Sequence, residues 1–226
     1  MTAAVFSIVV PVLNEAALIA PLLRELRRRF TQAELVVVDG GSRDDTVRQA
    51  LPLCDQLLIG EQGRAAQMNL GALAATGDYL FFLHADSLPE VHEEELLAEL
   101  SSAPEWGFSP LRLTGRRRSL RLIAWFINGR SRLTAVATGD QMQFVRRELF
   151  LESGGFDPIP LMEDVALSKR LRRRAAPHVM PWPVLTSSRR WEEGGIVRTV
   201  LRMWSLRLAY FLGVHPDRLV RFYYGR

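Results

Sequence analysis

Two side chains that can bind a metal ion follow an apolar run, in the stretch FFLHADS at residues 81–87. His84 and Asp86 stand one residue apart, directly after YLFFL at residues 79–83, which has the composition of a buried strand. A divalent cation that also binds a diphosphate takes one or two oxygen ligands from a protein, and Asp86 can supply one. His84 could add a nitrogen ligand, which Mn²⁺ tolerates better than Mg²⁺. A strand-end histidine followed by a helix-capping aspartate would give the same triplet, and the triplet alone favours that interpretation.

A second set of candidate catalytic groups is acidic. Glu163 and Asp164 lie in LMEDVAL at residues 161–167, at the start of a predicted helix, where the helix dipole stabilises acids and capping is the default interpretation. Capping does not explain two adjacent acids preceded by bulky apolar residues, and a carboxylate in partly apolar surroundings can act as a general base. Asp140, in GDQ at residues 139–141, stands just before a predicted strand.

The elements that must position these groups are clearest in residues 1–90. Apolar strand patterns alternate there with amphipathic helix patterns, which predicts a parallel α/β sheet covered by helices on both faces. Pro21 falls in the first predicted helix, and we place it in the first turn, where a proline costs no hydrogen bond. The predicted strands are 6–10, 34–39, 56–59 and 79–83, and the helices after the first are 44–51 and 64–76.

Beyond residue 90 the pattern becomes less regular. We predict one domain over residues 1–226: a ligand-binding half (1–90), a second half (91–190) and basic C-terminal helices (191–226). Predicted strands are 106–113 and 142–145, and predicted helices are 92–100, 120–133, 147–153, 163–174 and 196–212. The last helix is apolar nearly all round, which indicates either burial or contact with lipid.

Polar residues should gather at one edge of this sheet, because open parallel sheets bind ligands at the carboxyl ends of their strands. The first strand ends at Asn14 and Glu15, and the fourth ends at Asp86. The second ends at Asp39, followed by Gly41 and Ser42. An acid there often accepts hydrogen bonds from a ribose or a base, although a tight turn that caps the next helix explains the same residues.

Composition narrows the classes of protein. The single Cys54 excludes an internal disulfide framework and a cysteine-cluster zinc site. No secretory signal and no run of 18 apolar residues is present, so we expect a cytoplasmic protein without a spanning helix. Residues 195–226 hold six arginines and one acid, Asp217. That bias suggests an anionic partner, such as the inner face of the plasma membrane, and a basic soluble tail is the alternative.

Five segments in this order resemble the family-2 glycosyltransferases of GT-A fold. They are SIVVPVLNE, VVVDGGSRDDT, GRAAQMN, ATGDYLFFLHADS and GGF…MEDVAL. With SSRRWEEGG at residues 187–195, they are most similar to a small bacterial subgroup associated with radical-SAM and selenium-related domains. The resemblance implies a Rossmann-like, mostly parallel sheet with a helical C-terminal extension.

The resemblance also implies an activity, the transfer of a sugar from a nucleotide-diphosphate sugar, with a UDP-sugar as first expectation. It implies Mn²⁺ or Mg²⁺ as cofactor, an inverting outcome and an unknown acceptor hydroxyl, for which a lipid-linked molecule is one expectation. Asp86 matches the last acid of the D-x-D metal motif, and Asp164, beside Glu163, matches the catalytic base. The implied donor-site residues are Pro11, Asn14, Glu15, Asp39, Gly41, Ser42, Arg64, Asn69 and Asp86, and the implied acceptor and diphosphate residues are Asp140, Arg189, Arg190 and Trp191.

Two departures from the family pattern leave alternatives open. His84 replaces the first acid of D-x-D, and the glutamine that processive members place before R-W is Ser187 or Ser188. A degenerate homologue that binds a nucleotide or a membrane is therefore one alternative, and a sugar nucleotidyltransferase is another. A nucleic-acid binder is disfavoured, because the predicted ligand edge is acidic and would repel a phosphate backbone.

Overall fold

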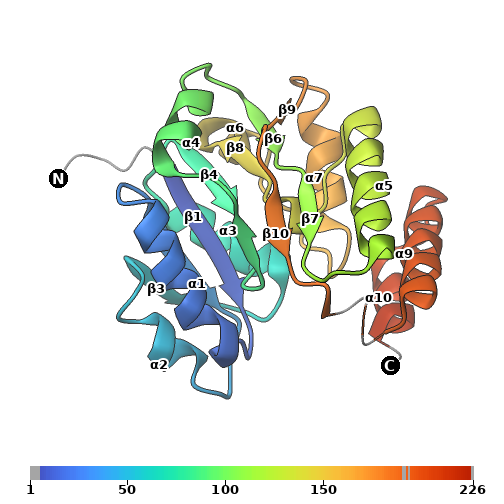
Figure 1. Ribbon diagram of the computed structural model, residues 1–226, viewed down its shortest axis with the longest axis horizontal. Helices are drawn as coiled ribbons and strands as arrows, with labels where there is room; N and C mark the ends of the chain where they lie inside the picture. The colour runs from blue at the N-terminus through green and yellow to red at the C-terminus, as the bar shows by residue number, and fades with distance from the viewer. Residues whose placement is uncertain (1–5, 190–191, 193, 225–226) are drawn as a thin grey trace.

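The computed structural model describes residues 6–189, 192 and 194–224, and a mixed sheet forms its centre (Figure 1). Among these residues the sheet has seven strands, in the order β3-β2-β1-β4-β8-β6-β9. In that order they are β3 (Gln56–Ile59), β2 (Glu34–Asp39), β1 (Phe6–Val12), β4 (Tyr79–Phe82), β8 (Phe144–Arg146), β6 (Trp106–Phe108) and β9 (His178–Val179). β1 to β4 are parallel, whereas β8 runs antiparallel to β4 and β6. The predicted mostly parallel α/β sheet is confirmed.

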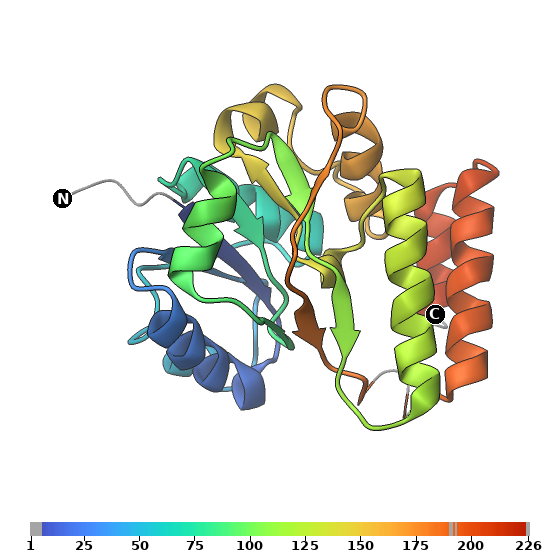
Figure 2. The same cartoon turned by 45° about the horizontal axis from the view of Figure 1, so that its top comes forward.

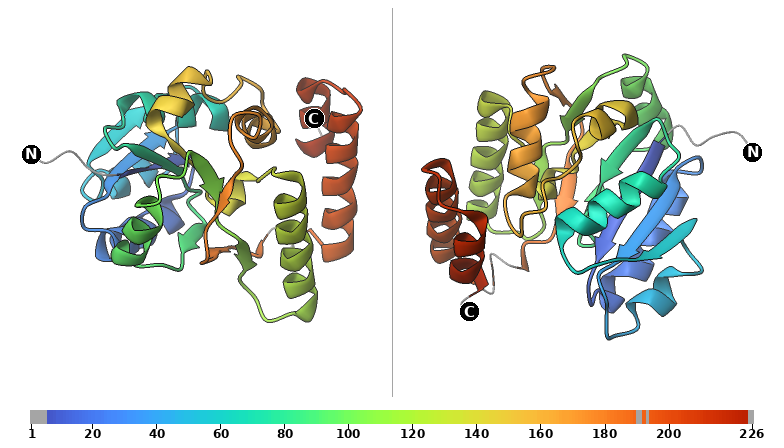
Figure 3. Two further views of the ribbon diagram at one scale, coloured as in Figure 1. Left: turned by 90° about the horizontal axis from the view of Figure 1, so that it is seen from above. Right: turned by 180° about the vertical axis from the view of Figure 1, so that it is seen from behind.

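Helices cover both faces of this sheet (Figure 3). Successive residues of β1 point to opposite faces, so Ile8 and Val10 join one apolar cluster and Val9 joins the other. α1 and α4 pack on the first cluster, and α3, α6 and α7 pack on the second. The helices are α1 (Ala16–Arg29), α2 (Thr46–Ala50), α3 (Arg64–Ala74), α4 (Glu93–Leu100), α6 (Arg147–Glu152) and α7 (Glu163–Leu171).

A second, three-stranded sheet is formed by short strands that the sequence patterns did not reveal. β10 (Val184–Thr186) pairs antiparallel with β5 (Ser87–Pro89) and parallel with β7 (Leu111–Leu113). The single strand predicted over 106–113 is therefore wrong, because β6 and β7 belong to different sheets. The break falls at Pro110, which has no N–H to donate, and at Ser109, whose N–H donates to the Gln141 carbonyl instead.

Other predicted boundaries also need correction. Pro21 lies inside α1, not in its first turn. It is tolerated because Pro21 and Ala17 are both exposed, so water can bond the Ala17 carbonyl that lacks a helical donor. The strand predicted to begin at 142 begins at Phe144, and the helix predicted to reach 174 ends at Leu171. The division of the chain into two halves and a C-terminal segment stays a prediction.

At Gly71, α3 lies close against the sheet. A Cβ at Gly71 would lie 2.4 Å from Val9 Cγ1 and 2.9 Å from Val38 Cγ2. We therefore expect Gly71→Ala to lower the free energy of unfolding by about 1–3 kcal/mol, measured by urea denaturation. Gly129 is the matched control, because it is also helical but has open space around its Cβ position. Gly129→Ala should raise stability by about 0.4–1 kcal/mol, and equal effects at the two sites would contradict the packing argument.

Three helices, α5 (Arg118–Thr134), α9 (Ile196–Phe211) and α10 (Pro216–Tyr224), lie at one end of the molecule. α5 and α9 run side by side there (Figures 1 and 2). The inner face of α9 is buried through Leu206, which packs with Val136, Met162 and Val165. Within the part of the chain that the structure describes, no helix has both the length and the apolar character needed to cross a membrane.

Candidate functional site

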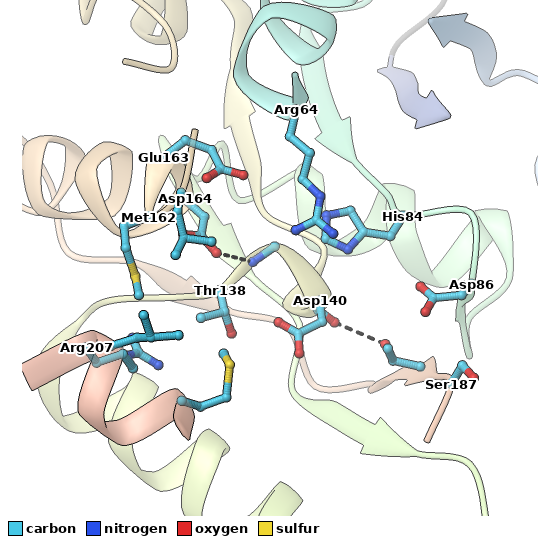
Figure 4. A pocket seen from close by; sticks show the side chains of 15 residues that line it. Arg64, His84, Asp86, Thr138, Asp140, Met162, Glu163, Asp164, Ser187 and Arg207 are labelled. Atoms are coloured by element: carbon cyan, nitrogen blue, oxygen red, sulfur yellow. Dashed lines mark hydrogen bonds between the residues drawn. The ribbon is translucent and has the colours of Figure 1, made fainter. Parts of the chain in front are cut away.

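One cavity, with a volume of about 110 Å³, gathers most of the predicted catalytic groups (Figure 4). It lies between the ends of β4 and β10, the short 3₁₀ helix η1 (Gly139–Gln141), and the starts of α3 and α7. α9 forms a further wall. The lining residues are Arg64, His84, Asp86, Thr138, Gly139, Asp140, Leu161, Met162, Glu163, Asp164, Thr186, Ser187, Met203, Leu206 and Arg207.

Asp164 is fixed in this cavity by two backbone donors. Its Oδ2 accepts a hydrogen bond from the N–H of Gly139 at 2.7 Å, and its Oδ1 accepts one from its neighbour Val165 at 2.7 Å. Burial raises the pKa of Asp164, while these two donors favour its charged form and oppose the shift. Met162, directly before the acidic pair, has a left-handed backbone with φ of 71°. That conformation is uncommon for a non-glycine residue and fixes the direction in which α7 enters the site.

Glu163 is the second carboxyl group of the pair, and its neutral form is favoured. Burial raises the pKa of Glu163 to about 7, and the charge of Asp164 adds to the shift. Two adjacent buried carboxylates do not both ionise readily, and Asp164 has the stronger hydrogen-bond donors. Of the two, Asp164 is therefore the better placed to carry a negative charge, and Glu163 the better placed to hold a proton.

This arrangement predicts a pH dependence of stability. The folded pKa of Glu163 is raised from 4.5 to about 7, so the folded state binds more protons than the unfolded state between these values. The free energy of unfolding should therefore fall as pH rises through this window, by about 1–3 kcal/mol. Glu163→Gln should remove this part of the dependence in urea denaturation at pH 5 and pH 8. A variant with an unchanged pH profile would contradict the assignment.

Arg64 is the cation that lies between the two sides of the cavity. It begins α3, and in Figure 4 its guanidinium lies beside His84 and opposite Glu163. Its positive charge lowers the pKa of Asp164, of Glu163 and of Glu15, against the opposite effect of burial at each. Arg64 is thus positioned to stabilise negative charge that develops on a ligand in the cavity.

His84 and Asp86 face the same cavity from the end of β4. A Cβ at Gly139 would lie 2.8 Å from His84 Nε2 and 3.7 Å from Asp164 Oδ2, so a glycine there lets the imidazole lie close against η1. Asp86 Oδ1 accepts a hydrogen bond from Ser87 Oγ at 3.2 Å, and the Asp86 carbonyl accepts one from the Ser187 N–H at 3.1 Å. The carboxylate and the imidazole are therefore both held where a ligand in the cavity can reach them.

The side chains of His84 and Asp86 suit a metal ion that takes its other ligands from a bound molecule. Among the described residues, no three His, Cys, Asp or Glu side chains are grouped closely enough to hold a metal by themselves. A carboxylate from Asp86 and a nitrogen from His84 are the one or two protein ligands that a cation bound to a diphosphate needs. The mixed oxygen and nitrogen set fits Mn²⁺ better than Mg²⁺.

The loops after β1 and β2 form a second group of predicted site residues, outside the cavity lining. Asp39 is buried, and its Oδ2 accepts hydrogen bonds from the N–H groups of Gly41 and Ser42, both at 2.8 Å. Its other oxygen, Oδ1, is buried without a hydrogen-bond partner, which leaves an acceptor available to a ligand. Asn14 ties the two loops together, because its N–H donates to Ser42 Oγ and its Oδ1 accepts from the Arg43 N–H.

Glu15 connects this second group to the cavity. Burial raises its pKa, and the charge of Asp86 raises it further. The positive charge of Arg189 acts on Glu15 in the opposite direction. β1 and β4 are neighbouring parallel strands, and the N–H of Ser187, after β10, donates to the Asp86 carbonyl after β4. The ends of β1, β4 and β10 therefore lie close together, as predicted for the carboxyl edge of the sheet. Pro11, within β1 opposite Val38, is half-buried next to this edge.

Not every predicted site residue is brought into the cavity. The side-chain amide of Asn69 makes reciprocal hydrogen bonds with the backbone of Phe156, at 2.9 Å and 2.8 Å. Asn69 thus holds the loop before α7, and its predicted contact with a nucleotide stays a prediction. Ser187 lines the cavity, whereas Ser188 is buried with its N–H bonded to Thr114. Arg190 and Trp191 lie outside the described residues.

The sequence patterns missed the wall that α9 contributes. Met203, Leu206 and Arg207 line the cavity from this helix. Together with Thr199 and Tyr210, they recur at intervals of three and four residues, so the spacing contains the signal for an inward face. The almost continuous apolar composition of the helix obscured that face.

Comparison with known proteins relates the N-terminal part of the chain to a family of glycosyltransferases. Residues 7–117 match the family model "Glycosyl transferase family 2". A PGL/p-HBAD biosynthesis glycosyltransferase of Mycobacterium tuberculosis is 39% identical over 110 residues, which cover 45% of this chain and 42% of that relative. The chain thus matches less than half the length of this curated relative. The narrower resemblance to the radical-SAM-associated subgroup stays a prediction.

Two solved structures share the fold. S. aureus TarS in complex with UDP has a TM-score of 0.62 and 19% identity, over 80% of this chain and 60% of that chain. Mannosyltransferase PcManGT from Pyrobaculum calidifontis, in complex with GDP-Man and Mn²⁺, has a TM-score of 0.60 and 22% identity, over 96% of this chain and 64% of that chain. The predicted GT-A fold is confirmed by these likenesses. Residues 7–117 of this chain, just under half of its length, are thus similar to glycosyl transferase family 2.

Proposed function

We propose that this protein transfers a sugar from a nucleotide-diphosphate sugar to an acceptor hydroxyl. One observation carries the proposal: a single cavity presents a fixed carboxylate, Asp164, opposite a candidate metal-binding pair, His84 and Asp86, with Arg64 between them. A base on one side and charge-stabilising groups on the other are what glycosyl transfer requires.

The donor would lie along the carboxyl edge of the sheet. The free buried oxygen of Asp39 can accept a hydrogen bond from a base or a ribose, and the loops held by Asn14 and Ser42 lie beside it. The diphosphate would then extend toward Asp86 and Arg64. TarS in complex with UDP, and PcManGT in complex with GDP-Man and Mn²⁺, support a nucleotide-sugar donor for this fold. A UDP-sugar remains our first expectation.

Asp164 would act as the general base. Its carboxylate removes the proton from an acceptor hydroxyl while the hydroxyl oxygen forms a bond to the anomeric carbon. The bond from that carbon to the diphosphate oxygen breaks at the same time, so the electron pair leaves with the nucleoside diphosphate. Attack from the side opposite the leaving group inverts the anomeric configuration.

Positive charge is needed where the diphosphate leaves. Arg64 can supply it from the start of α3, and Arg189 is close enough to influence Glu15 at the same edge. A divalent metal held by Asp86 and His84 would add Lewis-acid stabilisation of the leaving diphosphate when bound. Asp140, on η1, lies between the two sides and is placed to bind either the transferred sugar or the acceptor.

The test is a calorimetric titration of the protein with UDP, GDP and TDP, each with and without Mn²⁺. We expect one of the three to bind with Mn²⁺ and to bind more weakly without it. Incubation of the matching nucleotide sugars should then release that nucleoside diphosphate slowly, with water as acceptor. No binding of any nucleotide would contradict the proposal and favour a degenerate homologue. Binding without turnover of any sugar would contradict the catalytic part.

A further inference from the structure

Two helices at one end of the molecule carry large apolar side chains that nothing in the described chain covers. On α9, the outer stripe consists of Leu201, Trp204, Leu208 and Phe211, which are 59%, 63%, 59% and 76% exposed. These residues recur at intervals of three and four, so they lie on one face of the helix. That face is opposite the one through which Leu206 is buried.

α5 has an outer stripe of the same kind. It consists of Leu122, Trp125, Phe126 and Leu133, which are 55%, 67%, 52% and 89% exposed. The rings of Trp125 and Phe126 contact each other, with centroids 5.0 Å apart. Scattered exposed leucines are ordinary on a protein surface, but eight large apolar residues on two helices are more than chance exposure. The two helices run side by side (Figure 2).

The charged side chains on these two helices are all of one sign. Neither α5 nor α9 contains an aspartate or a glutamate. Exposed arginines accompany both stripes: Arg118, Arg121 and Arg132 are in α5, and Arg198 is in α9, where Arg202 is half-buried. Tryptophan and phenylalanine next to arginine are typical of helices that lie in the interface of a bilayer, where the rings enter the acyl boundary and the guanidinium groups meet anionic headgroups.

The same charges disfavour a second copy of the chain as the occupant. A twofold dimer would bring the same patch of both copies together, so arginines would face arginines without an acid between them. An anionic lipid surface instead attracts every arginine that it meets. Each such arginine strengthens binding about fivefold. The charge pattern therefore favours a membrane over self-association.

We propose that the outer stripes of α5 and α9 dock this protein on an anionic membrane surface. The opposite face of α9 lines the cavity through Met203, Leu206 and Arg207, so docking brings that wall of the site next to the bilayer. If the proposed transferase function holds, an acceptor carried by the membrane is then within reach of the cavity. The docking itself does not depend on that function.

The test is co-sedimentation with vesicles of phosphatidylcholine alone and of phosphatidylcholine mixed with phosphatidylglycerol. We expect binding to the mixed vesicles that weakens as salt rises, and little binding to the neutral ones. Leu208→Gln should weaken binding roughly tenfold, because a buried leucine side chain is lost from the interface. Arg132→Gln should weaken it about fivefold.

Two matched controls lie outside the proposed surface. Leu73, on α3, is 65% exposed, so Leu73→Gln makes the same change on a helix of similar exposure. Arg24, on α1, is exposed, and Arg24→Gln is the control for charge. Both should bind vesicles like the unsubstituted protein. All four side chains are exposed, so the variants should fold.

Three outcomes would overturn the proposal: equal binding to neutral and anionic vesicles, equal losses in the controls, or no binding to either vesicle. Light scattering gives a further check. A dimer that Leu208→Gln dissociates, in a protein that does not bind vesicles, would assign the stripes to self-association. Because nucleotide binding is measured separately, failure of membrane docking and failure of the proposed function are distinguishable.

Discussion

Replacing Asp164 with asparagine should lower the rate of glycosyl transfer by roughly 10²–10⁴-fold, the range expected for loss of a general base. The substitution keeps the size of the side chain, but the amide cannot accept a proton. Nucleotide binding should change little, because Asp164 lies on the side of the cavity away from His84 and Asp86. The measurement is release of the nucleoside diphosphate from the donor identified by titration, with calorimetry for the affinity.

Asp157→Asn is the control for this prediction. Asp157 also precedes α7, but its carboxylate pairs with Arg170 at 2.6 Å and does not line the cavity. The turnover of the Asp157→Asn variant should match that of the unsubstituted protein. In Asp164→Asn, the side-chain amide can replace only one of the two carboxylate oxygens that accept backbone hydrogen bonds. The stability of the variant should therefore be measured by thermal unfolding alongside its rate. Near-native turnover in a folded Asp164→Asn protein would remove Asp164 as the base.

Replacing Asp86 with alanine should abolish the Mn²⁺-dependent part of nucleotide binding. We expect the dissociation constant with Mn²⁺ to rise at least about 10–100-fold, because even the partners of metal ligands contribute that much. Affinity without metal should be nearly unchanged, since Asp86 itself only repels a diphosphate. The measurement is the same titration with and without Mn²⁺, which separates loss of metal binding from loss of nucleotide binding.

Asp78 gives the control at the opposite end of the same strand. It precedes β4, whereas Asp86 follows it, and it is exposed. Asp78→Ala should retain the Mn²⁺ dependence. His84→Ala separates the two candidate ligands: if the imidazole binds the metal, this variant weakens Mn²⁺-dependent binding as well. Full Mn²⁺ dependence in Asp86→Ala would exclude Asp86 as a metal ligand.

The sequence predicted the elements whose own residues form a long or strongly apolar pattern. β1, β2 and β4 are mostly apolar runs, so their composition alone predicts buried strands. Ligands bind at the carboxyl ends of such strands, so Asp86 and Glu15 were predicted to lie at one edge. The structure has β1 and β4 side by side in parallel, with these residues after their ends. The acidic pair at 163–164 also lies at the start of a helix, as predicted.

The parts that sequence could not predict depend on contacts between distant segments. β5 and β10 are three residues long, and they pair Ser87 with Thr186. No local pattern of three residues specifies such a pairing, because a strand that short has less than two periods of alternation. The same holds for which of Ser187 and Ser188 faces the cavity: Ser187 lines it, whereas the N–H of Ser188 donates to Thr114.

α9 presents one face to the cavity and the other to the surroundings, and this has a thermodynamic consequence. A ligand in the cavity that contacts Met203 or Arg207 acts on the same rigid helix that carries Trp204 and Leu208 on its outer side. Linkage requires that any energetic coupling through the helix be reciprocal. If filling the cavity makes α9 bind its outer partner more tightly, that partner raises the affinity of the cavity for its ligand by the same factor.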